Sequence, residues 1–169
     1  MINGTTQYNV GTVVEYLYDM GELVAIVADR TQAVATTMID KDGDHYEQLS
    51  ATEDNKWELH RYANDAWEEV CAMTRAYHHC APTQCDRDSV TQQYSIILEF
   101  PATWQERSVL PLDYGMRDYM VSAMTARWWQ AKGMTAQMEI ETAKKTSAEK
   151  EIRYSINSRT HRQRSTSWI

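Results

Sequence analysis

Residues 50–79, SATEDNKWELHRYANDAWEEVCAMTRAYHH, carry the strongest helical pattern in the chain. Apolar residues recur there every three or four positions, which is the spacing of one face of an α-helix. They are Leu59, Tyr62, Ala63, Ala66, Val70, Met73 and Tyr77, with Trp67 and Cys71 widening the face. Ser50 and Glu53 have the spacing of a capping box, so we expect the helix to begin there. It should end near residues 78–79, because Pro82 prevents continuation.

A second helix is expected upstream of this one. Thr12 and Glu15 form another pattern of the capping-box type, and apolar residues continue at helical spacing to about Met38, with a bend at Gly21. The β-branched residues within 23–27 leave a strand open as an alternative for part of this segment.

The segment that follows the central helix is expected to form a loop and then a strand. Residues 80–89 should form a loop, and residues 90–100 should form a strand that Pro101 ends. In that strand Tyr94, Ile96 and Leu98 alternate with Ser95, Ile97 and Glu99. A strand needs a partner. The partner could lie elsewhere in the chain, in a hairpin through residues 80–100, or on another subunit.

Two more helices are expected after Pro101. One begins at Pro111 and Asp113, ends at Gly133, and has Met116, Met120, Met124, Trp128 and Ala131 on one side. Of the adjacent Trp128 and Trp129, both could be core, or one could face a partner. The other helix covers residues 135–158. Its stripe is thin and partly polar, as in a helix that lies against a neighbouring chain: Ile140, Ala143, Ser147, Glu151 and Tyr154.

The predicted fold is therefore mainly α, a bundle of about four helices with a short β-strand or hairpin at about 90–100. Residues 1–158 are expected to form a single helical domain, and residues 159–169 an extended, basic docking tail. The chain has 169 residues, of which 43% are hydrophobic and 24% charged, so a wholly disordered chain is excluded. Its apolar runs are shorter than a membrane helix needs, and its start lacks a secretory pattern, so we expect synthesis in the cytoplasm.

Charge is unevenly distributed along the chain. Residues 142–169 hold seven basic and two acidic residues, a net charge of +5, whereas residues 1–141 hold ten basic and twenty-two acidic residues, a net charge of −12. An acidic body with a basic end can attract further copies of itself. The basic end could also contact phosphates. The terminal pair Trp168-Ile169 is interpreted as an apolar anchor.

Metal sites and catalytic sets are weakly supported. Residues 40–51 begin like a calcium loop but carry His45 and Ala51 where glycine and glutamate are needed. A compact but irregular group of candidate zinc ligands consists of Cys71, His78, His79, Cys80 and Cys85. The nucleophile elbow, the phosphate loop and the dinucleotide fingerprint are all lacking, so neither an enzyme nor a cofactor is expected.

The order of these elements resembles that of the head-to-tail connector proteins, also called adaptor or neck ring proteins, of tailed bacteriophages. The resemblance is to those of Bacteroides and crAss-like phages. It covers most of residues 50–164. It rests on the strand ending in residues 100–104 (FPATW), the helix containing residues 114–121 (YGMRDYMV), the Arg127-Trp128-Trp129 segment and the basic tail.

The resemblance implies a structural virion protein, made in the host cytoplasm, that forms a homo-oligomeric ring, expected to be a dodecamer, beneath the portal. Its partners would be the portal, other neck and tail proteins, and DNA passing without sequence-specific contact; no membrane is involved. The expected partner-binding residues are Arg153, Arg159, Arg162, Arg164, Trp168 and Ile169. A tail-completion protein, a small DNA-binding packaging accessory protein and a zinc-binding protein remain alternatives.

Overall fold

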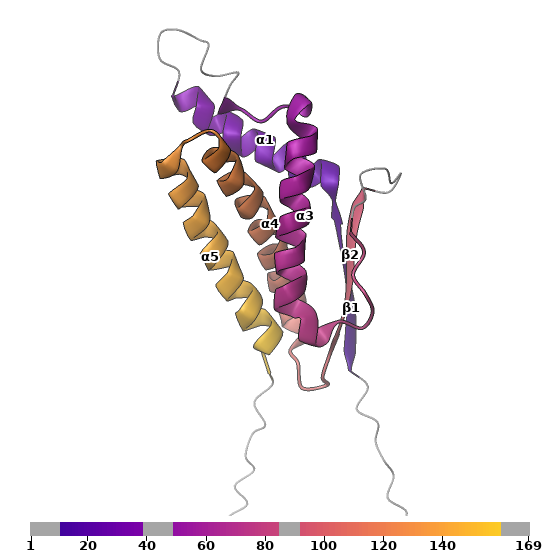
Figure 1. Cartoon of the computed structure of the whole chain (residues 1–169). Helices are drawn as coiled ribbons and strands as arrows, with labels where there is room; N and C mark the ends of the chain where they lie inside the picture. The colour runs from indigo at the N-terminus through magenta and orange to yellow at the C-terminus, as the bar shows by residue number, and fades with distance from the viewer. Residues whose placement is uncertain (1–10, 39–48, 85–91, 160–169) are drawn as a thin grey trace, which may run out of the picture.

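Helix α4, Val109–Ala131, lies at the centre of the fold, with three other helices packed around it (Figure 1). They are α1 (Met20–Thr37), α3 (Lys56–Thr74) and α5 (Thr135–Asn157). This computed structural model describes residues 11–38, 49–84 and 92–159. Residues 119–126 of α4 are all buried, as expected for a helix enclosed on several sides. The predicted mainly α fold of about four helices with a β element is confirmed.

A two-stranded antiparallel sheet covers one side of the helices. Strand β1, Thr12–Asp19, pairs along its whole length with β2, Gln93–Phe100. Alternate residues of both strands point inward, and Trp67 of α3 packs its ring against Tyr18 and Tyr94. The predicted strand and its alternation are confirmed, and its partner lies in the same chain. On the other edge of β2, residues 78–83 add two isolated β-bridges, His78 to Leu98 and Thr83 to Ser95.

The expected helix over residues 12–38 is wrong in its first part. Residues 12–19 form β1, and α1 begins only at Met20. The side chain that caps α1 is Asp19, which accepts a hydrogen bond from the backbone N–H of Glu22 at 3.0 Å. The alternative strand at 23–27 is also wrong, because these residues lie within α1. Pairing with β2 and burial of alternate tyrosines outweigh the local capping pattern.

The central helix keeps its predicted face but not its predicted start. Residues 53–55 form a 3-10 turn, and α3 begins at Lys56, so the Ser50 capping box is wrong. The Asn55 side chain instead accepts a hydrogen bond from the Thr52 backbone N–H. The predicted residues Leu59, Tyr62, Ala63, Ala66, Trp67 and Val70 are buried. A 3-10 turn at 75–77 replaces the last predicted helical turn.

The two C-terminal helices have nearly their predicted bounds, and Gly133 separates them with a positive φ of 71°. The predicted stripe of α5 is wrong by one position. Ile140 and Tyr154 are exposed, whereas the buried face carries Glu141, Ala148, Ile152, Ser155 and Ile156. The reason is that α5 packs on α4 along this second face, and a shift of one residue turns a helix face by about 100°.

Both tryptophans of α4 belong to the core. Trp128 and Trp129 are 0% and 1% exposed, so the alternative in which one faces a partner is wrong. The Trp128 indole N–H donates a hydrogen bond to the Leu49 carbonyl oxygen at 2.8 Å. The central position of α4 lets neighbours in the same chain cover adjacent residues.

Candidate functional site

The two ends of the described fold lie at the same end of the molecule (Figure 1). Thr12, the first residue of β1, pairs with Phe100, and Arg159 forms a β-bridge with Trp104. The rings of Phe100 and Trp104 stack with centroids 4.0 Å apart and planes inclined by 10°. The Trp104 indole N–H also donates to the Ser155 carbonyl oxygen at 2.8 Å. This aromatic pair therefore ties the start of β1 to the end of α5.

Arg159, a predicted partner-binding residue, is held by its own domain. Its guanidinium donates to the Ile156 carbonyl oxygen at 2.8 Å and to the Tyr77 hydroxyl at 3.0 Å, and it lies over the Tyr77 ring. The Arg159 carbonyl oxygen accepts a hydrogen bond from the Gln105 side chain at 2.6 Å. The last described residue is thus fixed on the fold.

The other predicted docking residues lie on α5 or beyond the described part. Arg153 is exposed on α5 and pairs with Glu149 at 2.8 Å. Arg162, Arg164, Trp168 and Ile169 lie outside the described residues. Two further basic residues of α5 form ion pairs inside the domain, Lys144 with Glu141 and Lys145 with Glu69. Two of the seven positive charges counted on residues 142–169 therefore pair with carboxylates of residues 1–141.

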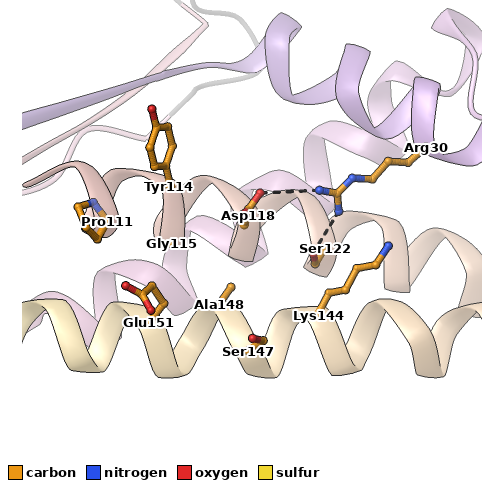
Figure 2. Close-up of a pocket in the computed structure, with 10 residues that line it drawn as sticks. All are labelled: Arg30, Pro111, Tyr114, Gly115, Asp118, Ser122, Lys144, Ser147, Ala148 and Glu151. Atoms are coloured by element: carbon orange, nitrogen blue, oxygen red, sulfur yellow. Dashed lines mark hydrogen bonds and ion pairs between the residues drawn. The ribbon is translucent and has the colours of Figure 1, made fainter. Parts of the chain in front are cut away.

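An open groove of about 570 Å³ lies between α1, α4 and α5 (Figure 2). Small residues, Gly115 and Ala148 among them, line it on the α4 and α5 sides. On the α1 side, the Arg30 guanidinium donates to Ser122 Oγ at 3.2 Å and lies 3.7 Å from Asp118. It also reaches Glu141 at 3.4 Å. That carboxylate is only 7% exposed and has Lys144 as a second partner.

Charge pairing is the chemistry that this groove offers. Ser122 accepts its hydrogen bond from a guanidinium, which does not make the hydroxyl oxygen more nucleophilic. Arg30 and Lys144 compensate the buried charge of Glu141, which would otherwise be costly. The groove therefore combines paired charges with a lining whose larger part is apolar.

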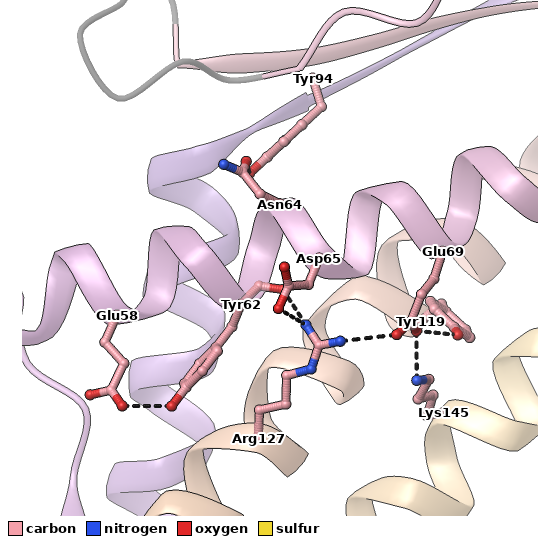
Figure 3. A network of polar contacts seen from close by, with 9 residues as sticks. All are labelled: Glu58, Tyr62, Asn64, Asp65, Glu69, Tyr94, Tyr119, Arg127 and Lys145. Carbon is pink, nitrogen blue, oxygen red and sulfur yellow. Dashed lines mark hydrogen bonds and ion pairs between the residues drawn. The ribbon is translucent and has the colours of Figure 1, made fainter.

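A second charged cluster joins α3, α4 and α5 (Figure 3). Glu69 accepts from Lys145 at 2.6 Å, from the Tyr119 hydroxyl at 2.6 Å and from Arg127 at 2.9 Å. Arg127 also pairs with Asp65 at 2.9 Å. Burial by itself would raise the pKa of Glu69, but these donors outweigh it and hold the pKa below its usual value. The carboxylate therefore connects three helices while ionised.

Two of the five candidate zinc ligands, His78 and His79, contact other side chains, and Cys80 is an exposed free thiol. Burial, followed by the nearby Glu68, raises the pKa of Cys71 to about 12, which disfavours the thiolate that binds metal. His78 Nε2 lies 3.0 Å from the Thr74 hydroxyl, and His79 Nδ1 lies 2.8 Å from Glu99. Cys85 and the acidic loop at 40–44 lie outside the described residues. Among the residues that are described, no group of three or more His, Cys, Asp or Glu is placed to hold a metal ion.

Sequence reasoning missed the outer face of the sheet. Val13 and Leu17 of β1 are 53% and 55% exposed, and Glu15 lies between them on the same face. They alternate with the buried Tyr16 and Tyr18, whose hydroxyls donate to the Val109 and Asp113 carbonyl oxygens on α4. Because the outer face is itself partly apolar, hydropathy does not alternate along residues 12–19, and the local signal for a strand was their content of β-branched and aromatic residues.

No family model, curated protein or solved structure matches the chain. None of the described helices is both long enough and apolar enough to cross a bilayer. The outer face of β1, the anchoring of Arg159 and the groove between α1, α4 and α5 are therefore the features from which a function can be argued.

Proposed function

We propose that the protein is a non-enzymatic structural component of a tailed-phage virion, a subunit of the neck ring beneath the portal. The choice of this protein class rests on the resemblance of most of residues 50–164 to connector proteins. The observation that carries the proposal is the anchoring of Arg159 against Tyr77 and Trp104. Because Arg159 is fixed on the fold, the residues that follow it start from a defined point on the surface, as a docking tail requires.

Charge supports the same role. Residues 1–158 have a net charge of −10, whereas residues 159–169 contain Arg159, Arg162 and Arg164 and no acidic residue. Opposite charges on body and tail favour contacts between copies and steer their association. An acidic surface lining a channel would also repel DNA phosphates and let DNA pass without sticking. The partners in this account are further copies of the chain, the portal and other neck or tail proteins.

Electron microscopy of the purified full-length chain tests the proposal. We expect closed rings with an axial channel. A chain ending at Arg159 keeps every described contact, so its circular dichroism spectrum should be unchanged while the rings are lost. A full-length chain that forms no rings at any concentration would contradict the proposed function. Strongly salt-dependent DNA binding by the same chain would instead favour a packaging accessory protein.

A further inference from the structure

Strand β1 has an open edge. It pairs with β2 along all eight residues, and within the described part of the chain no strand or bridge pairs with its other edge. Natural proteins usually protect such an edge with proline, charged side chains, a bulge or a covering segment. The sequence of β1, TVVEYLYD, contains no proline, its register with β2 is continuous, and its two charged residues, Glu15 and Asp19, are both acidic. The backbone groups on this edge are available to another strand.

Exposed apolar side chains gather around this edge. On α4, Val109 and Asp113 accept hydrogen bonds from Tyr16 and Tyr18 of β1, so the first turns of α4 lie beneath the strand. Four of the seven large exposed apolar side chains in the described residues belong to β1 or to these turns. They are Val13, Leu17, Leu110 and Tyr114. A concentration of this kind marks an interaction site.

The outer face of β1 alternates apolar and acidic residues, Val13, Glu15, Leu17 and Asp19. On β2, Glu99 pairs with Val13 and adds a carboxylate to this face, where His79 already contacts it at 2.8 Å. A strand laid beside this face would need basic side chains within reach of its carboxylates and an apolar side chain near Val13 or Leu17.

Resting on the proposed function, we propose that the β1 edge accepts residues 160–169 of a second copy as an added strand. The tail reads THRQRSTSWI and has neither glycine nor proline. Arg162, Arg164 and Trp168 occupy alternate positions, so one face of an extended tail would present two guanidinium groups and an indole. Ten extended residues span about 33 Å and β1 about 27 Å, so the lengths are compatible.

The root of the tail favours a second copy over the same chain. Ser158 is already extended, with φ −65° and ψ 122°, and Arg159 is tied to Tyr77. Tyr77 directly precedes His78, which bridges to β2 on the edge opposite β1. The tail therefore leaves from one side of the sheet and its acceptor edge lies on the other. Two different surfaces on opposite sides make a head-to-tail contact, which closes into a ring when the rotation allows.

Charge reversal in the full-length chain tests this inference, with native mass spectrometry as the readout. Glu15→Arg changes the acceptor edge, and Arg162→Glu with Arg164→Glu changes the tail. Each should weaken assembly at least tenfold, and the combination of all three should restore it. Glu151→Arg makes the same charge change in the groove and should leave assembly intact. Thermal melting checks that every variant is folded.

Hydrogen exchange provides a second readout on the same variants. Backbone amides of residues 12–19 should exchange more slowly in the assembled wild type than in the tail-reversed variant. Rings that persist in Glu15→Arg, or equal exchange of β1 with and without the tail charges, would overturn the strand-addition inference and leave the neck-ring proposal standing. Failure of the wild type to form rings would instead count against the proposed function.

Discussion

Gly115 on α4 packs directly against Ile152 on α5. A Cβ atom at Gly115 would lie 3.1 Å from Ile152 Cγ1 and 3.4 Å from the Ile152 backbone nitrogen, so the contact depends on the missing side chain. Ile152 is fully buried at this contact. The glycine allows the final helix to pack closely along the central one, and it fixes which face of α5 is buried.

Gly115→Ala should therefore destabilise the protein. Alanine improves helix propensity by about 1 kcal/mol, but overpacking typically costs about 1–3 kcal/mol, and the backbone of α5 cannot move like a flexible side chain. We expect a net loss of about 1 kcal/mol in the free energy of unfolding, measured in urea. The control is Ser147→Ala, an exposed position on α5, which should change little. A variant as stable as wild type would show that the two helices separate easily.

Trp104→Ala should damage the junction between the two chain ends. The variant loses the stack on Phe100 and the hydrogen bond to Ser155, so we expect a cost of about 3–5 kcal/mol. Trp57→Ala is the matched control, because Trp57 is 57% exposed and its replacement should cost far less. Equal losses of unfolding free energy in the two variants would contradict the structural role assigned to Trp104.

The Glu69 cluster predicts a loss of stability in acid. The pKa of Glu69 is lower in the folded state than its usual value of 4.5, so its contribution is complete above pH 4.5 and is lost as the pH falls through the folded-state pKa. Glu69→Gln should lower the free energy of unfolding at pH 7. The difference between variant and wild type should shrink as the pH falls below 4.5. A difference independent of pH, measured by urea unfolding across this range, would contradict the assignment.

Arg159 should contribute more to the free energy of unfolding than the residues after it. Removing residues 160–169 should change the free energy of unfolding by less than about 0.5 kcal/mol. Arg159→Ala loses the contacts to Ile156 and Tyr77 and should cost about 1–2 kcal/mol. Arg153→Ala, which breaks only an exposed pair with Glu149, should cost about 0.3–0.5 kcal/mol. A larger loss from the truncation than from Arg159→Ala would place the stabilising contacts in the tail.

Local periodicity predicted the helices whose buried faces are apolar. The faces of α3 and α4 could be identified because residues such as Leu59 and Met116 recur at helical spacing and are buried by neighbours. The strand at β2 was also predictable, since Tyr94, Ile96 and Leu98 alternate. Gly133 marked the end of α4, where a positive φ is required.

The errors arose where distant contacts decide the structure. Residues 12–19 form a strand because β2, some 80 residues later, pairs with them. The buried face of α5 includes Glu141, which is acceptable only because Arg30 and Lys144 neutralise it. The anchoring of Arg159 by Tyr77 likewise depends on a residue from another part of the chain. None of these pairings has a local signature in the sequence.

Native mass spectrometry of the purified full-length chain, prepared without chelator, tests the central claim most directly. The chain has a mass of 19.6 kDa, so each stoichiometry gives a distinct total mass. The account predicts one dominant metal-free assembly of ring size, with twelve copies expected from the resemblance to neck proteins. A monomer at every concentration, or a monomer carrying one zinc ion, would contradict it.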